Sequence, residues 1–146
     1  MKALTKERTD ILKLEDSMRQ LDNYEEGDGP CKITHYFAPG CYAREMWMPA
    51  GCLITGKIHK TEHICILSQG RVTVASGNDS ITYTAPQTIV SKVGAKRAIY
   101  AHEDSTWTNI HPTELETPDE VEAEIIAETY EELDLFLEHE ERKRIK

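Results

Sequence analysis

Two histidines four residues apart, His59 and His63, are the residues whose type and spacing best suit chemistry in this sequence. Imidazole binds transition metals and transfers protons near neutral pH. On a helix the two would share a face, but the segment is rich in isoleucine and threonine, which favour strands. On one straight strand the rings would stand about 13 Å apart, too far to share an ion. We therefore predict a tight turn at residues 60–62 that brings them face to face across a hairpin.

Short strands separated by turn residues must position these histidines. Segments rich in β-branched and aromatic residues alternate with turn residues at a spacing of about 8–12 residues, which is typical of a sandwich or barrel. Closing such a sheet also removes exposed strand edges. The predicted strands cover residues 32–37, 42–48, 52–59, 63–67, 71–75, 80–84, 88–91, 96–102, 105–110 and 121–127.

A helix is predicted on each side of this strand-rich region. Apolar residues recur at helical spacing from Leu4 to Leu21, and Thr5 suits the N-cap position. Near the other end, Thr129 and Glu132 have the spacing of a capping box. We therefore predict a single all-β domain over residues 1–146, with an N-terminal helix in 1–24, a barrel over 31–127 and a C-terminal helix over 129–146.

The composition is that of an ordinary globular chain with an acidic excess. Of the 146 residues, 39% are hydrophobic and 29% are charged, and the formal net charge is −9. Half of the 26 acidic residues lie between Glu114 and Glu141, so the chain repels phosphate backbones and we expect no nucleic-acid binding. No apolar run reaches the roughly 20 residues of a membrane-spanning helix. Residues 1–10 contain no signal-peptide core, so we expect a cytoplasmic protein with free thiols at its four cysteines.

The segment from Gly56 to Val72 resembles the first motif of the cupin superfamily. That motif consists of a glycine, a metal-binding HxH pair, a glutamate and a glycine that closes the next strand. Counted back from Gly70, His63 occupies the glutamate position, His59 the second histidine position and Lys57 the first. The second motif, a PxG turn followed by a histidine, resembles residues 92–94, with Arg97 at the histidine position.

The resemblance covers residues 37–112 and implies a cupin-type double-stranded β-helix (jelly-roll barrel), most similar to small cupin-domain proteins of phages and bacteria. Cupin sites bind Fe, Mn, Ni or Zn through three histidines and a glutamate. Here His59 and His63 fall at ligand positions, and His111 is a candidate third ligand because a hairpin at residues 103–104 would bring it near Arg97. His102 is a second candidate for the third ligand, but it lies beside that turn and is expected to be solvated. This interpretation implies a divalent transition metal and a metal-dependent dioxygenase or isomerase.

Two basic residues at ligand positions, Lys57 and Arg97, favour another interpretation. Cations and histidines that converge in one cavity suit a small anion of the sugar or nucleotide type. Metal-free epimerases of the same superfamily use a histidine base, here His63 or His59, with basic residues on the substrate and a tyrosine acid. Tyr42, Tyr83 and Tyr100 are candidates for the acid, with Tyr42 our choice as a ligand-binding residue. A third alternative is a non-catalytic barrel that binds a ligand or has a structural role.

The strand that carries His63 also predicts self-association. Ile64 and Ile66 point away from the face that carries His63 and Cys65, so both faces of this strand are apolar. Such a strand needs cover outside the barrel, from the terminal helices or from a second subunit. We predict a homodimer.

Overall fold

The computed structural model describes residues 5–76 and 79–145, so the predicted helix limits at Leu4 and Lys146 lie outside the described residues. These residues form eleven strands and three helices. The strands are β1 (Lys32–Ala38), β2 (Cys41–Met48), β3 (Leu53–Thr55), β4 (Ile58–His59), β5 (His63–Gln69), β6 (Arg71–Ser76), β7 (Asp79–Thr84), β8 (Gln87–Ser91), β9 (Ala98–Ala101), β10 (Ser105–Pro112) and β11 (Ile126–Ala127). The helices are α1 (Lys6–Arg19), α2 (Pro118–Ile125) and α3 (Tyr130–Ile145).

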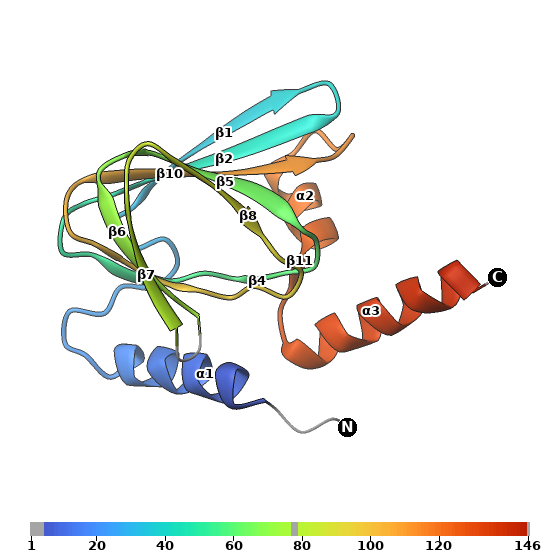
Figure 1. Ribbon diagram of the computed structural model, residues 1–146, viewed down its shortest axis with the longest axis horizontal. Coiled ribbons are helices and arrows are strands. Elements are labelled where there is room, and N and C mark those ends of the chain that lie inside the picture. The colour runs from blue at the N-terminus through green and yellow to red at the C-terminus, as the bar shows by residue number, and fades with distance from the viewer. Residues whose placement is uncertain (1–4, 77–78, 146) are drawn as a thin grey trace.

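The strands form two antiparallel sheets that face each other (Figure 1). One sheet has the order β1-β2-β10-β5-β8 and the other the order β3-β9-β6-β7, while β4 pairs separately with β11. The chain passes directly from one sheet to the other between β2 and β3, β5 and β6, β7 and β8, β8 and β9, and β9 and β10, and it passes from β3 to β5 by way of β4. This topology confirms the predicted all-β jelly roll.

The core lies between the two sheets because each strand turns alternate residues inward. In β5 the inward set is His63, Cys65 and Leu67, all buried, while Ile64 is 43% exposed. The five-stranded sheet contributes Leu67 and the four-stranded sheet contributes Val72, and both are fully buried in the same cluster. The alternation in β5 therefore places His63 and Cys65 inside the barrel and Ile64 outside it, as the sequence predicted.

The predicted strand over residues 121–127 is wrong for most of its length, because residues 118–125 form α2. The Thr117 side chain accepts a hydrogen bond from Glu120 N, and Pro118 occupies the first turn, where its missing N–H costs nothing. Val121 and Ile125, four residues apart, are the buried residues of this helix. Within the predicted strand only Ile126 and Ala127, which form β11, are extended. The segment 31–127 that was predicted to form the barrel therefore also contains helix α2.

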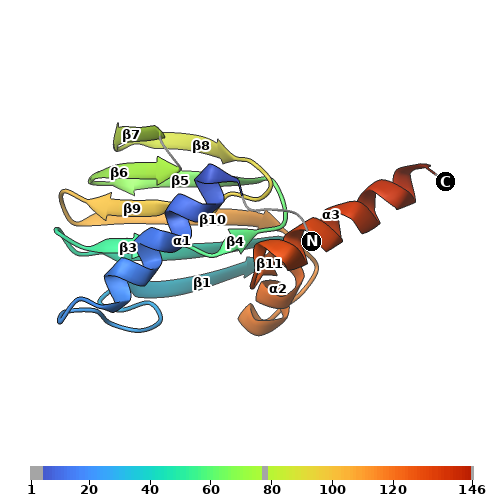
Figure 2. The same ribbon diagram turned by 90° about the horizontal axis from the view of Figure 1, so that it is seen from below.

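Helix α1 covers the outer face of the four-stranded sheet (Figure 2). Ile11 is its buried residue and packs in one cluster with Ile58 of β4 and Leu133 of α3. Arg8 of α1 donates two hydrogen bonds, of 2.9 and 3.0 Å, to the carboxylate of Asp134 in α3. The terminal helices are therefore tied to the barrel and to each other. None of the helices in residues 5–76 and 79–145 has the length and apolar character needed to cross a membrane.

Both predicted helix caps are present. Thr5 Oγ1 accepts from Arg8 N at 3.3 Å, and Thr129 Oγ1 accepts from Glu132 N at 3.1 Å. The reciprocal bond of the second cap runs from Glu128 N to Glu132, one residue before the position that a standard capping box uses. Both helices therefore begin at the predicted capping residues.

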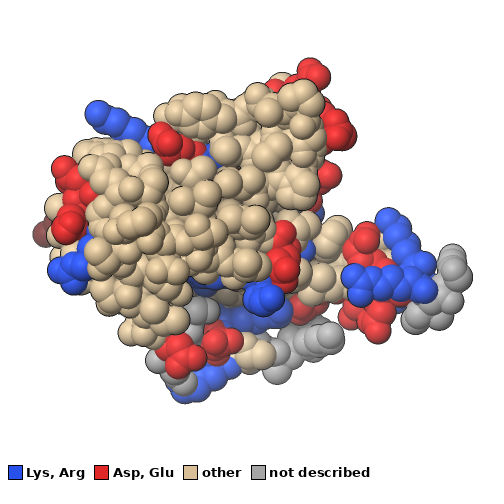
Figure 3. Space-filling model, turned by 45° about the horizontal axis from the view of Figure 1, so that its top comes forward, with Lys and Arg blue, Asp and Glu red and all other residues tan. Residues whose placement is uncertain are grey.

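The outer face of the five-stranded sheet carries a row of apolar side chains that crosses every strand. Strand register aligns Tyr36 with Ala43, Ala43 with Ile110, Ile110 with Ile64, and Ile64 with Val90. Three of these side chains are well exposed: Tyr36 (52%), Ile64 (43%) and Val90 (51%). Figure 3 shows a broad surface here that is almost free of charged residues, with most of the acidic and basic side chains at its margins.

Candidate metal centre

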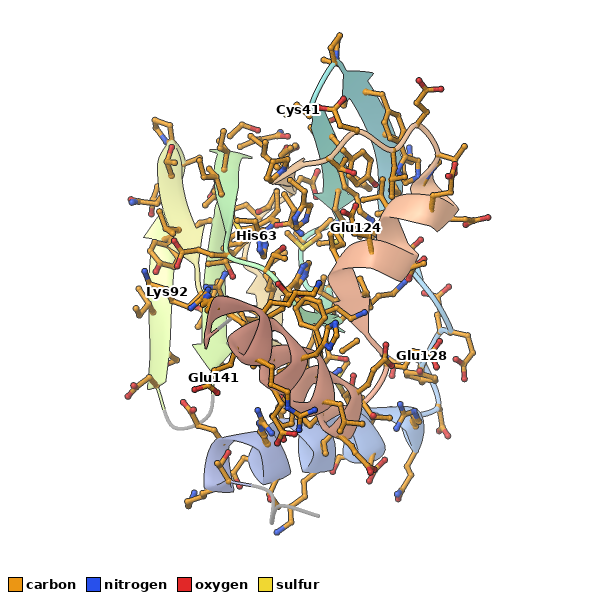
Figure 4. All side chains as sticks on the ribbon, turned by 90° about the vertical axis from the view of Figure 1, so that its right-hand side faces the viewer. Cys41, His63, Lys92, Glu124, Glu128 and Glu141 are labelled. Atoms are coloured by element: carbon orange, nitrogen blue, oxygen red, sulfur yellow. The ribbon has the colours of Figure 1, made fainter. Side chains whose placement is uncertain are left out.

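Three histidines converge inside the barrel: His59, His63 and His111. The ring centroids of His59 and His63 are 4.3 Å apart, those of His63 and His111 4.4 Å, and those of His59 and His111 5.5 Å. One ring nitrogen from each residue lies within 4.8 Å of the other two. In Figure 4, which looks at the end of the molecule where α2 and α3 lie, His63 is in the middle of the barrel.

His59 and His63 face each other as predicted, but the hairpin expected between them is wrong. β4 pairs with β11, whereas β5 pairs with β10 and β8, so the two histidines belong to different pairs of strands. Residues 60–62 form a corner between these pairs, and the corner turns the end of β4 toward the start of β5. The pairing differs because β10 and β8 take both edges of β5.

His111 reaches the same place from β10, although not through the hairpin expected at residues 103–104. β9 and β10 lie in opposite sheets, and the residues between them cross from one to the other. Ile110 is aligned with Ile64 in the neighbouring β5, which sets His111 beside the start of β5, where His63 lies. His102 lies outside the cluster: it is half-buried, and its Nε2 is 2.6 Å from Thr73 Oγ1.

Burial keeps the three imidazoles neutral. Burial, together with the neighbouring His63 and His111, lowers the pKa of His59 to about 2. Burial also lowers the pKa of His111, to about 4, and that of His63, where a hydrogen bond to Thr61 O partly opposes the shift. Neutral imidazole is the form that binds metals, so these residues need not lose a proton at neutral pH to act as ligands.

The hydrogen bonding of the cluster fits a metal. His59 Nδ1 and His111 Nδ1 are buried and have no hydrogen-bond partner in the described part of the chain, which is costly for a polar atom. His63 Nδ1 lies 3.2 Å from Thr61 O, so it donates there and Nε2 carries the lone pair, and the His63 ring also bonds to the Asn109 side chain. Nitrogens on a tetrahedral ion with bonds of about 2.1 Å lie about 3.4 Å apart. The three ring nitrogens lie within 4.8 Å of one another, so they would have to move closer together to share one ion.

The cluster opens onto a cavity of about 400 Å³ between the sheets, bordered on one side by α2. Arg97 and Tyr42, two predicted ligand-binding residues, line it. Tyr42 is almost fully buried, and its hydroxyl is 2.7 Å from His35 Nδ1, a partnership that the sequence did not reveal. Lys57, the third, is exposed and forms an ion pair with Glu122 of α2.

Further polar residues of this cavity escaped the sequence analysis because only strand register places them. Asn109 lies two residues before His111 on β10 and accepts a hydrogen bond from Trp107 Nε1 at 2.9 Å. Ser91 is 1% exposed, lines the cavity and is aligned with His63 across β5 and β8. Period-two alternation from His111 would have indicated Asn109 once β10 was known to be next to β5.

Comparison with solved structures identifies the architecture. A cupin superfamily protein from Desulfitobacterium hafniense DCB-2 aligns over 60% of this chain and 82% of its own, with a TM-score of 0.50 and 9% identity. This chain has the cupin fold. A transcriptional regulator of the HTH_3 family from Vibrio cholerae aligns over 59% of this chain and 52% of its own, with a TM-score of 0.50 and 15% identity.

An acetylacetone dioxygenase from Acinetobacter johnsonii aligns with a TM-score of 0.48 and 17% identity over 56% of this chain. The chain spans 59% of the length of that dioxygenase and 52% of the length of the regulator. No protein-family model matches the sequence, and the search of curated proteins found no match. At these identities the likeness concerns the cupin fold, and the function has to be argued from the residues of this chain.

Proposed function

We propose that this cupin binds a divalent transition metal, such as Zn²⁺, Fe²⁺, Mn²⁺ or Ni²⁺, through His59, His63 and His111. The observation that supports this most is a pair of buried ring nitrogens, in a cluster of three neutral imidazoles, that have no hydrogen-bond partner among the residues that the structure describes. Buried polar atoms are almost always satisfied in proteins. A metal ion would satisfy several of these nitrogens at once.

Three nitrogen ligands suit a reactive rather than a structural site. Structural zinc sites are closed by four protein ligands, whereas catalytic sites have three and keep a position for water or substrate. When bound, such a metal supplies Lewis acidity and lowers the pKa of a bound water. The cavity beside the histidines is within the size range of small-molecule sites, about 300–1,000 Å³. We propose that a small polar molecule binds there, as a substrate of isomerase or dioxygenase type or as a ligand.

Titration of the chelator-treated protein with Co²⁺ or Zn²⁺ tests the metal site. We expect one ion per chain by elemental analysis and calorimetry. At free metal 100 times the dissociation constant, the folded state should gain about 2.7 kcal/mol. For a domain of this size that raises the melting temperature by roughly 5–10 °C. Absence of both stoichiometric uptake and a thermal shift would rule out the metal site.

We also propose that two copies of the chain associate through the outer face of the five-stranded sheet. The apolar row from Tyr36 to Val90 crosses all five strands, and the aligned row next to it contains one charged residue, Glu45. Chains with a net charge of −9 repel each other, and a face almost without charge minimises that repulsion. An isologous contact would place the same row on both sides of the interface.

Replacing Ile64 with lysine should separate the dimer. Light scattering after size exclusion should give twice 16.6 kDa for the wild type and 16.6 kDa for Ile64→Lys, because a lysine in the centre of the row would have to be desolvated. Ile81→Lys is the matched control: Ile81 is 54% exposed on β7 of the other sheet, so this variant should remain dimeric. A monomeric wild type, or a dimeric Ile64→Lys, would contradict the proposed interface.

A further inference from the structure

We infer that the molecule bound beside the histidines is a small carboxylate, held by the guanidinium group of Arg97. The inference rests on the proposed metal site, which would occupy the adjacent histidine cluster. It deepens that proposal by naming the chemical class of the ligand and the residue that recognises it.

The first argument is the position of Arg97. It lies just before β9 in the four-stranded sheet and lines the cavity that the histidines share. Its Nη1 is 4.0 Å from the sulfur of Cys65, two residues along β5 from His63.

The second argument is that Arg97 lacks an ion-pair partner where other cations of the cavity have one. Arg44 pairs with Asp28 at 3.0 Å, and Lys57 pairs with Glu122. Within residues 5–76 and 79–145, Arg97 forms no ion pair. The positive charge of this half-buried guanidinium is poorly compensated, because the neighbouring imidazoles are neutral. A bound metal would add further positive charge to the cavity. An anion in this cavity would restore the balance.

The third argument concerns shape and the neighbouring donor. The guanidinium is a planar fork that binds a carboxylate through two parallel hydrogen bonds. Asn109 is aligned with Cys65 across β5 and β10, so it lies near Arg97 as well as His63. The carbonyl oxygen of Asn109 accepts from Trp107 and the side chain also bonds to His63, so its amide NH₂, which has two hydrogens, still offers a donor to a ligand. One guanidinium and one amide suit a carboxylate better than a phosphate dianion, which several cations usually bind.

The experiment compares anion binding in Co²⁺-loaded wild type, Arg97→Met and Arg71→Met. Methionine preserves much of the length of arginine but removes its charge and its donors. Arg71 is an exposed arginine on β6 outside the cavity and serves as the matched control. Oxalate, acetate and inorganic phosphate are titrated separately, with visible absorption of the bound Co²⁺ and calorimetry as readouts. Co²⁺ uptake and circular dichroism are recorded first for each protein.

We expect each carboxylate to bind the wild type and Arg71→Met equally, and to bind Arg97→Met roughly 10- to 100-fold more weakly, the range for a charged hydrogen bond. Arg97→Met should still take up one Co²⁺. Equal carboxylate affinity in Arg97→Met, no carboxylate binding, or a preference for phosphate would overturn the inference while leaving the metal site intact. Failure of the wild type to take up Co²⁺ would instead refute the proposed function on which the inference rests. If Arg97→Met does not fold, Arg97→Lys is measured, with a smaller loss expected because lysine cannot form the paired hydrogen bonds.

Discussion

Replacing His59 and His63 together with alanine should abolish transition-metal binding, lowering the affinity by at least about 100-fold. Even a residue that only supports a metal ligand costs 10- to 100-fold when it is lost, so the loss of two direct ligands should cost more. The remaining His111 could bind an ion only as an isolated imidazole. Calorimetry with Zn²⁺ and elemental analysis after gel filtration measure the loss. The thermal shift on adding metal should disappear with it.

A second pair of substitutions, His102→Ala with His139→Ala, controls for the number of histidines. His102 lies outside the cluster, hydrogen-bonded to Thr73, and His139 is exposed on α3. This protein should take up one ion with wild-type affinity. Should the alanine variant of the cluster misfold, His59→Gln and His63→Gln fill more of the space and test the same point. Stoichiometric metal in a folded protein that lacks both His59 and His63 would show that the ion binds elsewhere.

The fold could be predicted from the sequence because its signals are local. Turn residues and period-two alternation mark the strands, and the predicted limits of β1, β2, β5 and β10 lie within two residues of the observed ones. α2 was missed although Thr117 and Pro118 form a recognisable helix start. The apolar residues of that segment, Val121 and Ile125, suit a strand as well as one face of a short helix, so the cap was the signal that could have decided between them.

The site could be predicted only in part because it depends on which strands become neighbours. The spacing of His59 and His63 indicated that they would meet. The corner that brings them together forms because β4 pairs with β11 while β5 pairs with β10 and β8, and the spacing does not reveal that pairing. His111 was a candidate on the assumption of a hairpin that does not form, and it reaches the cluster through the pairing of β10 with β5. Asn109 carries no signal of its own until that pairing is known. That Arg97 has no ion-pair partner among the described residues is likewise visible only in three dimensions.

The crossing from β5 to β6 carries the second large expected effect, on stability. Gly70 makes this crossing with φ +90°, and β5 runs from His63 to Gln69, so the crossing lies at the opposite end of the strand from the histidines. An added Cβ would lie 2.5 Å from Asp104 O and 2.8 Å from Ser105 Cα, and it would also collide with Ser105 Oγ. Two of these atoms belong to the backbone, so rotation of a side chain cannot relieve the contact.

Gly70→Ala should therefore lower the free energy of unfolding by about 2–5 kcal/mol, the sum of a left-handed alanine, about 1–2 kcal/mol, and an overpacked backbone contact, about 1–3 kcal/mol. Urea denaturation followed by circular dichroism measures it. Gly51→Ala separates the two contributions, because Gly51 also has a positive φ, +84°, but a Cβ there meets nothing within 4 Å. This variant should therefore lose only the backbone cost of a left-handed alanine, about 1–2 kcal/mol. Equal losses in the two variants would mean that the chain relaxes around residue 70. A larger loss at Gly70, with Zn²⁺ binding retained in the folded protein, would show that this crossing stabilises the barrel without shaping the histidine cluster.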